Sequence, residues 1–348
     1  MKVSVVIPVF NAAAFVRESV VSALSQPEVT EVLLVEDGST DDSVAVCQQL
    51  AETDRRVRLL FTGRKQNRGA GWARNVGIKQ ANEEWISFLD ADDFMLPNRF
   101  RTTREVIREN GCQGVYEAVG LHFETSVFEE RWRQSGRLLL TTVTTKIVPE
   151  ELFIRQSPVG RDGYAHTDGW TVHRSVFRKA GLFNPTLRLH QDTDLFMRFA
   201  VAGRMLPGEI REPVAMRRLH DNNRITQHRP PRENFDHRIC MWGSTWRWAR
   251  RKEYEWQAQV LLFKLLEHCS RPGTDHWKKT SHSYTALMRF QRAGTLIPEL
   301  VEEVEFHRSL RSCFRRGVRF DLAGGRRRWM AAGSRMNRGL EGYAAERR

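Results

Sequence analysis

The first hundred residues alternate short apolar runs with segments whose apolar residues recur at helical spacing. The runs are aliphatic and β-branched, as in parallel strands buried on both faces, and they cover residues 3–10, 31–35, 57–61 and 84–89. Between them, apolar positions three and four residues apart predict helices that start near Asn11, at Ser43 and at Ala70. Asn11 is expected to cap the first helix, and Ser39 or Thr40 the second. This alternation predicts a Rossmann-like, mostly parallel α/β sheet flanked by helices.

The pattern changes further along the chain. Residues 138–148 are rich in Thr and Val and predict one or two strands, and residues 192–201 predict a helix. After Arg229-Pro230-Pro231-Arg232 the composition becomes helix-rich and aromatic. We therefore expect one domain over residues 1–228, with halves 1–100 and 101–228, and a helical, basic C-terminal extension over 229–348.

Composition narrows the class of protein. The 348 residues are 41% hydrophobic and 28% charged, which excludes a wholly disordered, collagen-like or disulfide-stapled protein. The five cysteines show no C-x-x-C spacing, which argues against a zinc cage and favours a reducing compartment. No apolar run approaches the roughly 20 residues of a membrane helix. A soluble, cytoplasmic protein is expected.

The positive charge is concentrated at the C-terminal end. The chain carries a net charge of +13, and residues 308–348 hold 12 arginines against three acidic residues, a net of +9. Arg308, Arg311, Arg315 and Arg319 recur at helical spacing, as on a basic amphipathic helix. The solvated face of an ordinary helix has the same pattern. A tail of this charge attracts anionic lipid or nucleic acid, and the charge does not distinguish them.

An acidic turn follows the fourth apolar run. Asp90-Ala91-Asp92-Asp93 places carboxylates two residues apart at the end of a buried strand, where open α/β sheets bind ligands. Such a pair can hold one hard divalent cation whose other positions take diphosphate oxygens. A solvated acidic turn or a helix cap before Pro97 is the competing interpretation.

Two other polar segments lie at the same predicted edge of the sheet. Asp37 follows the second run, where a carboxylate can accept a hydrogen bond from a nucleobase N–H group or belong to an ordinary capping turn. Residues 67–75 combine glycines, which permit close backbone approach, with Arg68 and Arg74, which can meet phosphate. This segment is neither G-x-G-x-x-G nor a P-loop.

Four motifs in this order resemble the family 2 glycosyltransferases of the GT-A fold. They are Val-Ile-Pro-Val-Phe-Asn, Val-Glu-Asp-Gly-Ser-Thr-Asp, Asn-x-Gly-x-x-x-Ala-Arg-Asn and Phe-Leu-Asp-Ala-Asp-Asp, all within the first 93 residues. Gly181-Leu182-Phe183-Asn184-Pro185 and Gln191-Asp192-Thr193-Asp194 resemble the family's segment around its catalytic base. The resemblance covers residues 3–224. It implies that residues 1–100 form a nucleotide-binding half and residues 101–228 an acceptor half.

The resemblance also assigns roles to individual residues. The residues implied to bind the donor nucleotide, diphosphate or sugar are Pro8, Phe10, Asp37, Asn67, Gly69, Arg74, Asn75 and Asp90. Asp92 is implied as the main metal ligand with His220 beside it, for Mn²⁺ or Mg²⁺, and Asp192 as the general base. The sequence departs from the family twice: Glu36 stands for the first acid of an Asp-Asp pair, and Gln191 for a Glu before the base.

The implied activity is inverting, metal-dependent transfer of a sugar from a nucleotide-diphosphate sugar, by default a UDP-sugar. The acceptor would be a hydroxyl of a glycan or lipid-linked saccharide, as in bacterial surface polysaccharide assembly, at the inner face of the cell membrane. No nucleic-acid partner is expected. The alternatives are a non-catalytic binder of an anionic surface or nucleic acid, and a nucleotidyltransferase. His166 and Asp168 either touch the acceptor or hold the fold.

Overall fold

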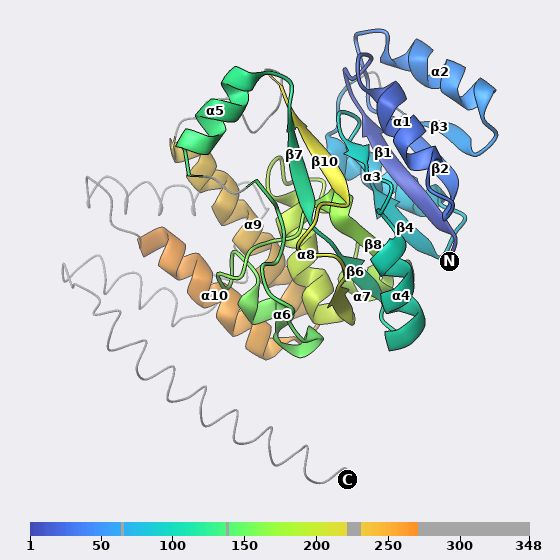
Figure 1. Cartoon of the computed structure of the whole chain (residues 1–348). Helices are drawn as coiled ribbons and strands as arrows, with labels where there is room; N and C mark the ends of the chain where they lie inside the picture. The colour runs from blue at the N-terminus through green and yellow to red at the C-terminus, as the bar shows by residue number, and fades with distance from the viewer. Residues whose placement is uncertain (64–65, 137–138, 221–230, 271–348) are drawn as a thin grey trace, which may run out of the picture. The chain divides into compact units, whose positions relative to one another are not determined.

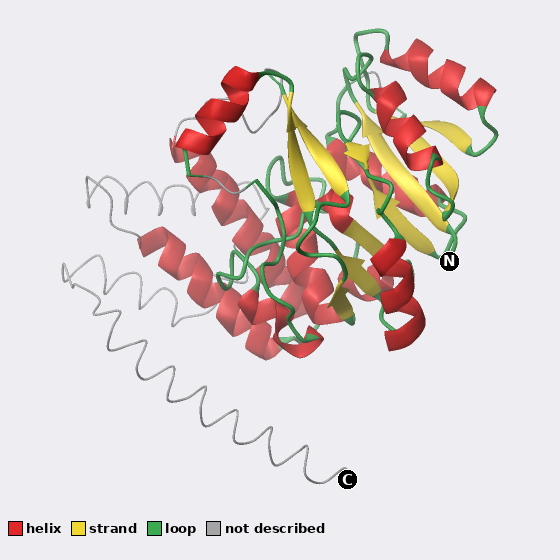
Figure 2. Cartoon of the chain, viewed as in Figure 1, coloured by secondary structure: helices red, strands yellow, loops and turns green. Residues whose placement is uncertain are grey.

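The computed structural model describes residues 1–63, 66–136, 139–220 and 231–270. They fall in a compact unit that runs from Met1 to Ala286 (Figure 1). Strands and helices alternate through the first half of this unit, and the described chain from 231 to 270 is almost wholly helical (Figure 2).

The central sheet has seven strands and is mostly parallel. In spatial order they are β3 (Val57–Phe61), β2 (Val29–Glu36), β1 (Val3–Val9), β4 (Trp85–Phe88), β8 (Trp170–His173), β6 (Gly114–Tyr116) and β9 (Met205–Pro207). Only the two pairs that β8 makes, with β4 and β6, are antiparallel. A smaller sheet holds β5 (Phe94–Met95), β10 (Ala215–Leu219) and β7 (Val119–Phe123) in that order. The predicted fold class is confirmed.

Helices cover both faces of the parallel strands. Alternate residues of β1, from Val3 to Val9, pack in one apolar core with α1 (Val16–Leu24) and α2 (Ser43–Thr53). On the other face, Val6 meets Gly77 of α3 (Ala70–Gln80), where an added Cβ atom would collide with the valine. This glycine therefore lets α3 lie close against β1, with the N-terminal end of the helix at the C-terminal edge of the strands.

The second half of the chain supplies the other helices. They are α4 (Arg101–Asn110), α5 (Ser126–Gln134), α6 (Pro149–Arg155), α7 (Ser175–Ala180), α8 (Gln191–Ala202), α9 (Pro231–Arg251) and α10 (Glu255–Ser270), with a 3-10 turn at Thr167–Gly169. Trp242 and Trp246 of α9 and Leu261 of α10 are buried. A helical extension is thus observed over 231–270. The rest of it, with the arginine-rich tail, lies outside the described residues, and the division near 228–232 stays a prediction.

Two capping predictions were wrong because their side chains pair across the sheet edge. Asn11 has a left-handed backbone (φ 49°), and its Oδ1 accepts a hydrogen bond from Thr40 N at 2.8 Å. Ser39 Oγ accepts from Asn11 N at 3.0 Å. Helix α1 is preceded by Phe15, without a side-chain cap, and Asp41 is the residue that accepts from Ser43 N. The loops after β1 and β2 are therefore bonded to each other.

The strands predicted over 138–148 do not form within the described residues 139–148. Thr141 makes a single bridge to Val119, and Val143 makes a single bridge to Gly163. Because neighbouring positions pair with different segments, no continuous ladder can develop. The Thr- and Val-rich composition indicated strand propensity but not a partner.

A buried ion pair joins α4 to the sheet. Arg99 Nη1 lies 2.9 Å from Glu117 Oε2, and neither side chain has any exposed surface. Arg99 Nη2 donates to Ser87 Oγ at 2.8 Å and to Trp170 O at 2.9 Å, and Thr103 Oγ1 donates to Glu117 at 2.8 Å. Burial raises the pKa of Glu117 and lowers the pKa of Arg99. Each charge is tolerated only because the other is present.

No helix among the residues that the structure describes is long and apolar enough to cross a membrane.

We predict that Glu117→Gln lowers the free energy of unfolding by about 3–5 kcal/mol, because the Arg99 charge stays buried without its partner. Urea denaturation at pH 7 measures the change. Glu109→Gln is the matched control, since Glu109 pairs with Arg108 on the surface and its loss should cost less than about 0.5 kcal/mol. Equal midpoints for the two variants would contradict the assignment.

Candidate functional site

The predicted site residues gather at the C-terminal edge of the parallel strands. Phe10 follows β1 and is 42% exposed, Asp37 follows β2, and Asp90 and Asp92 follow β4. Parallel strands end on the same side of a sheet, so these residues share one edge. Pro8 lies inside β1 beside Val35 of β2, and Asn67 lies half-buried before α3.

Asp37 organises the turn that begins α3. Its Oδ2 accepts hydrogen bonds from Gly69 N at 2.7 Å and Arg68 N at 3.0 Å, and the residue is only 2% exposed. Gly69 has φ +95°, a conformation that strains any other residue. The Arg68 guanidinium lies 3.3 Å from the ring centroid of Trp72. The carboxylate predicted to meet a nucleobase is therefore engaged with main-chain N–H groups of this turn.

Arg74 of α3 is the cation at the centre of the site. Its guanidinium forms an ion pair with Asp90. Burial disfavours the charged form, but Asp90, and after it Asp168 and Asp192, outweigh this effect and raise the pKa of Arg74. Asp90 comes from the end of β4 and Asp192 from α8, so the structure brings carboxylates from both halves of the chain to one arginine.

Asn75, the next residue on α3, is used to hold a neighbouring segment. Its Nδ2 donates to Phe183 O at 2.8 Å, and its Oδ1 accepts from Phe183 N at 2.9 Å. The amide is therefore satisfied on both sides by the main chain ahead of α8.

Asp192 occupies the first turn of α8. Its Oδ1 accepts from Thr193 N at 2.8 Å, and the side chain is half-buried. The preceding Gln191 is 7% exposed, and its Nε2 donates to Leu187 O at 2.5 Å. A Cβ atom on Gly71 of α3 would collide with the Gln191 amide. Gln191 thus packs α8 against α3 as a neutral group and brings no charge to Asp192.

Asp92 and His220 lie together, as the sequence implied for a metal site. His220 Nε2 is 3.2 Å from Asp92 Oδ2, with side-chain exposures of 10% and 30%. The imidazole packs on the Phe15 ring with 4.7 Å between centroids. A carboxylate oxygen and an imidazole nitrogen at this separation suit a divalent cation such as Mn²⁺, and their partial exposure leaves the approach open.

Arg218 aligns the two segments that carry this pair. Its Nε donates to Asp92 O at 3.0 Å, and its main-chain N–H donates to Asp93 Oδ1 at 2.7 Å. Arg218 belongs to β10 and precedes His220 by two residues. Arg218 therefore holds the acidic turn against the strand that ends just before His220. No pattern in the sequence indicated this role.

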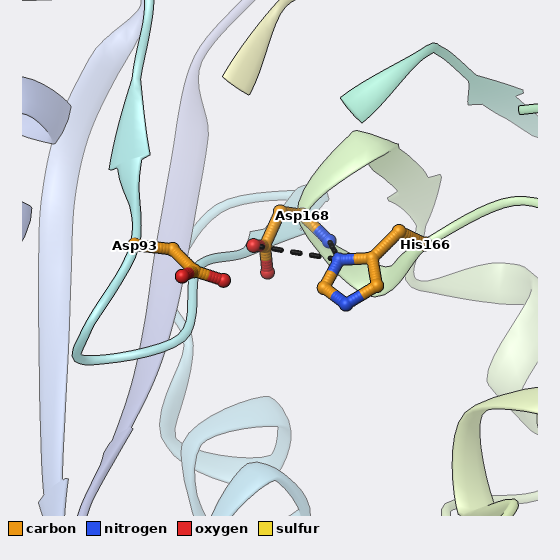
Figure 3. Close-up of side chains that lie close together, drawn as sticks. All are labelled: Asp93, His166 and Asp168. Carbon is orange, nitrogen blue, oxygen red and sulfur yellow. Dashed lines mark hydrogen bonds and ion pairs between the residues drawn. The ribbon is translucent and has the colours of Figure 1, made fainter. Parts of the chain in front are cut away.

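A buried cluster beneath the acidic turn was not predicted as a unit. Asp93, His166 and Asp168 are almost wholly buried, and one ligand atom of each lies within 4.8 Å of the others (Figure 3). Asp168 Oδ1 also accepts from Asp90 N at 3.2 Å. The His-x-Asp spacing after a glycine-rich loop was the only sequence signal, and it left a structural role and acceptor contact equally open. Burial and the hydrogen bond to Asp90 N favour the structural role, and the three side chains also form a set that could hold a metal ion.

The three groups of this cluster share charge and protons. Burial, and then the charges of Asp168 and Asp92, raise the pKa of Asp93 well above its ordinary value. Burial opposes ionisation of Asp168 as well, but His166 overrides it and lowers the pKa of Asp168 to about 2. Burial disfavours the charged imidazole, but Asp168 outweighs it and raises the pKa of His166. These shifts favour the protonated form of Asp93 and of His166 and the ionised form of Asp168.

The geometry of His166 accommodates both of its protonation states. Its Nδ1 lies 3.4 Å from Asp168 Oδ2 and also 3.4 Å from Asp168 N. A protonated Nδ1 donates to the carboxylate, whereas an unprotonated one accepts from the N–H group and caps the 3-10 turn. The raised pKa favours the first arrangement.

Comparison with known proteins identifies the family to which this chain is similar. A family model described as "Glycosyl transferase family 2" matches residues 4–181, just over half of the chain. The succinoglycan biosynthesis protein ExoU of Rhizobium meliloti is 30% identical over 206 residues, which are 58% of this chain and 57% of that protein. The glycosyltransferase GlyG of Streptococcus pneumoniae is 37% identical over 114 residues, 32% of this chain and 37% of that protein.

These matches span only part of each relative. An uncharacterised glycosyltransferase of Haemophilus influenzae is 34% identical over 109 residues, 31% of this chain and 43% of that protein. Among solved structures, residues 1–349 of TarS from S. aureus in complex with UDP superpose with a TM-score of 0.60 at 17% identity, covering 92% of this chain and 93% of that one. Identity this low shows a shared fold.

We predict that the stability provided by His166 decreases as pH rises. Because its folded pKa is above the unfolded value, the contribution is full below about pH 6.5 and is lost as pH passes the folded pKa. The stability difference between the wild type and His166→Gln should therefore shrink above pH 6.5, by about 1.4 kcal/mol per pKa unit of the shift.

Thermal unfolding from pH 5.5 to 9 measures this difference. In an Asp168→Asn background, which lacks the carboxylate that outweighs burial, the low-pH advantage given by His166 should disappear or reverse, because burial alone disfavours the charged imidazole. A wild-type advantage that stays constant across the range would refute the ion pair.

Proposed function

The chain belongs to glycosyltransferase family 2, and from that premise we propose that it transfers a sugar from a nucleotide-diphosphate sugar to an acceptor hydroxyl. The observation that carries this proposal is the meeting of Asp90 and Asp192 around Arg74. Asp90 lies at the edge of the sheet where α/β proteins bind nucleotides, and Asp192 approaches from α8. A donor held on one side and a base on the other is the arrangement that direct transfer needs.

The proposed donor is a UDP-sugar. TarS, which shares the fold, binds UDP and UDP-GlcNAc. In this chain, Phe10 offers an exposed ring for the base at the end of the strand that holds Pro8, and Asp37 fixes the adjoining turn. That turn at Gly69 opens a helix whose N-terminus favours phosphate. The residues that we propose for the diphosphate and sugar are Asn67, Gly69, Arg74, Asn75 and Asp90.

Asp92 and His220 are proposed to hold Mn²⁺ or Mg²⁺. Their 3.2 Å separation and partial exposure suit an ion that also contacts the donor, whereas the Asp93, His166 and Asp168 cluster is buried and already balanced in charge. Such an ion stabilises the negative charge that develops on the leaving diphosphate. Arg218 holds the segments that carry Asp92 and His220 next to each other.

Asp192 is proposed as the general base of an inverting displacement. Its carboxylate would take the proton of the acceptor hydroxyl as that oxygen attacks the anomeric carbon. The bond from the anomeric carbon to the diphosphate oxygen breaks on the opposite face, so the anomeric configuration inverts. Arg74, already close to both Asp90 and Asp192, provides positive charge on the leaving-group side.

The acceptor is proposed to be a glycan or a lipid-linked saccharide at the cytoplasmic face of a membrane. ExoU, a relative, is described as a succinoglycan biosynthesis protein. The basic tail of 308–348 would supply attraction to anionic lipid.

Nucleoside diphosphate binding tests the donor and metal assignments together. We predict that UDP at about 100 times its dissociation constant, with Mn²⁺, raises the melting temperature of the wild type by about 5 °C or more. Asp92→Asn should lose the part of the shift that depends on Mn²⁺, and Asp42→Asn, which changes an exposed acid at the start of α2, should keep it. No shift with any nucleoside diphosphate would favour the non-catalytic binder, and a shift only with nucleoside triphosphates would favour a nucleotidyltransferase.

Turnover tests the base. Asp192→Asn should lower kcat by about 10²- to 10⁴-fold, because the amide cannot accept the proton, while the UDP-induced thermal shift stays at the wild-type value. Proton NMR of the first product should show an anomeric configuration opposite to that of the donor. Near-wild-type turnover in Asp192→Asn, or retained configuration, would overturn this mechanism.

A further inference from the structure

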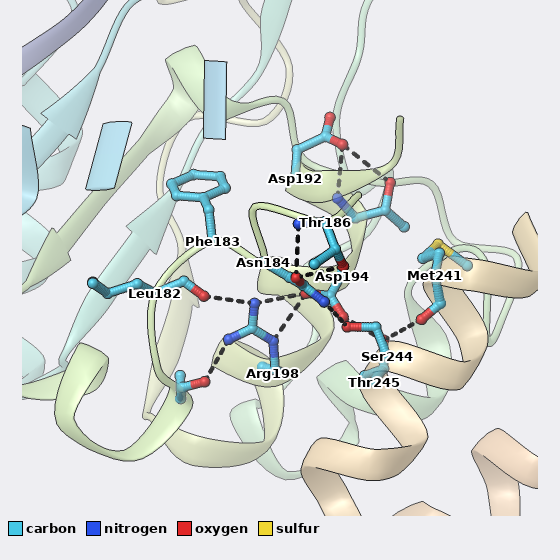
Figure 4. Close-up of polar contacts among 12 residues, drawn as sticks. Leu182, Phe183, Asn184, Thr186, Asp192, Asp194, Arg198, Met241, Ser244 and Thr245 are labelled. Carbon is cyan, nitrogen blue, oxygen red and sulfur yellow. Dashed lines mark hydrogen bonds and ion pairs between the residues drawn. The ribbon is translucent and has the colours of Figure 1, made fainter. Parts of the chain in front are cut away.

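Helix α9 is bonded directly to the first turn of α8 (Figure 4). The hydroxyl of Thr245 on α9 lies 2.8 Å from Oδ1 of Asp194, and neither residue has exposed surface. Thr245 Oγ1 also lies 3.0 Å from Met241 O, one turn earlier on its own helix. A hydroxyl has one proton and a carboxylate is the stronger acceptor, so we assign that proton to Asp194.

The second oxygen of Asp194 fixes the segment that precedes α8. Arg198 donates to Asp194 Oδ2 from Nε at 3.1 Å and from Nη2 at 2.6 Å. The same guanidinium donates to Ala180 O at 2.5 Å and Leu182 O at 2.9 Å. The buried Asp194 carboxylate therefore connects α9 to α8 directly, and through the Arg198 guanidinium it connects both to the main chain of residues 180–182.

Asp194 and Asp192 lie on opposite sides of the same helical turn. Successive helical side chains are rotated by about 100°, so residues two apart differ by about 200°. In Figure 4 the carboxyl group of Asp192 is directed away from α9, and that of Asp194 lies toward it. A rotation of this turn about the helix axis at Asp194 consequently displaces Asp192 in the opposite direction.

We propose that Thr245 is a positioning residue for Asp192, acting through Asp194, and that α9 thereby forms part of the transfer site. This inference rests on the proposed function of Asp192 as the base. Without the Thr245 hydroxyl, Asp194 keeps its bonds to Arg198 but has nothing to hold it toward α9. The first turn of α8 then samples orientations in which Asp192 is misaligned with the acceptor hydroxyl.

The surrounding contacts keep α9 in place when this one bond is removed. Asn184 Nδ2 donates to Ser244 Oγ at 2.8 Å, and Trp242 and Trp246 are buried along the helix. Thr245→Val, which has nearly the shape of threonine, should therefore fold. Thr245→Ser retains the hydroxyl and serves as the rescue variant.

The full chain is tested by steady-state kinetics with a UDP-sugar and by hydrogen–deuterium exchange. Thr245→Val should lower kcat by about tenfold or more, because small misplacements of a reacting group are costly, and should leave the donor KM unchanged. Thr245→Ser should restore most of the rate. Amide exchange should become faster in the first turn of α8 and not in α3.

Thr53→Val is the matched control. Thr53 is exposed at the end of α2, and its Oγ1 donates to Gln49 O at 2.7 Å. Like Thr245 and Met241, the two residues are four apart on one helix, but no carboxylate among the described residues is bonded to the Thr53 hydroxyl. This variant should match the wild type in kcat and in exchange at α8.

Two results would overturn the inference. A Thr245→Val enzyme that is less stable but keeps wild-type kcat would make Thr245 a purely structural residue, and the proposed function would stand on the wild-type turnover. If the wild type turns over no UDP-sugar, the proposed function fails separately, and unchanged exchange at α8 in Thr245→Val then rejects the anchoring role as well.

Discussion

The site depends on how two buried carboxyl groups, Asp93 at the end of the acidic turn and Asp168 beside it, are stabilised close together. Asp93 and Asp168 lie within contact distance with almost no exposed surface, and two adjacent buried anions would be strongly unfavourable. The conflict is eased locally: the raised pKa values of Asp93 and His166 favour their protonated forms, and the Arg218 main-chain N–H donates to Asp93. These contacts tie β4, the 166–168 turn and β10 together, and that junction determines where Asp92 and His220 stand.

The second requirement is that α3 approach both the sheet and α8. Any side chain in place of Gly77 would collide with β1, and any side chain in place of Gly71 would collide with Gln191. Arg74 lies between these glycines, so close packing on two sides holds its guanidinium among Asp90, Asp168 and Asp192. The neutral Gln191 is consistent with this packing, because another carboxylate at a 7%-exposed position would need its own cation.

The sequence predicted what depends on local pattern. Apolar runs located β1 to β4, helix bounds at Ser43 and Ala70 were confirmed, and motif order indicated which residues share the sheet edge. It failed where partners are distant in the chain. Asn11 and Ser39 resemble helix caps but bond across two loops, and the strand-like 139–148 segment finds no continuous partner. The roles of Asp93, Arg218 and Thr245 depend on partners between 51 and 126 residues away, which no spacing reveals.

The donor and acceptor sides of the site are stabilised in different ways. Donor-side residues follow strands that pack in a continuous apolar core, or stand on α3, within the 4–181 segment that the family model matches. Asp192 lies beyond that segment, and its helix is held by polar contacts of Asp194 and Arg198 that extend to α9. Directional bonds specify orientation where apolar packing alone tolerates rotation. An element that lies outside the matched segment can therefore orient Asp192, and under the proposed mechanism this makes α9 a structural partner of the transfer step.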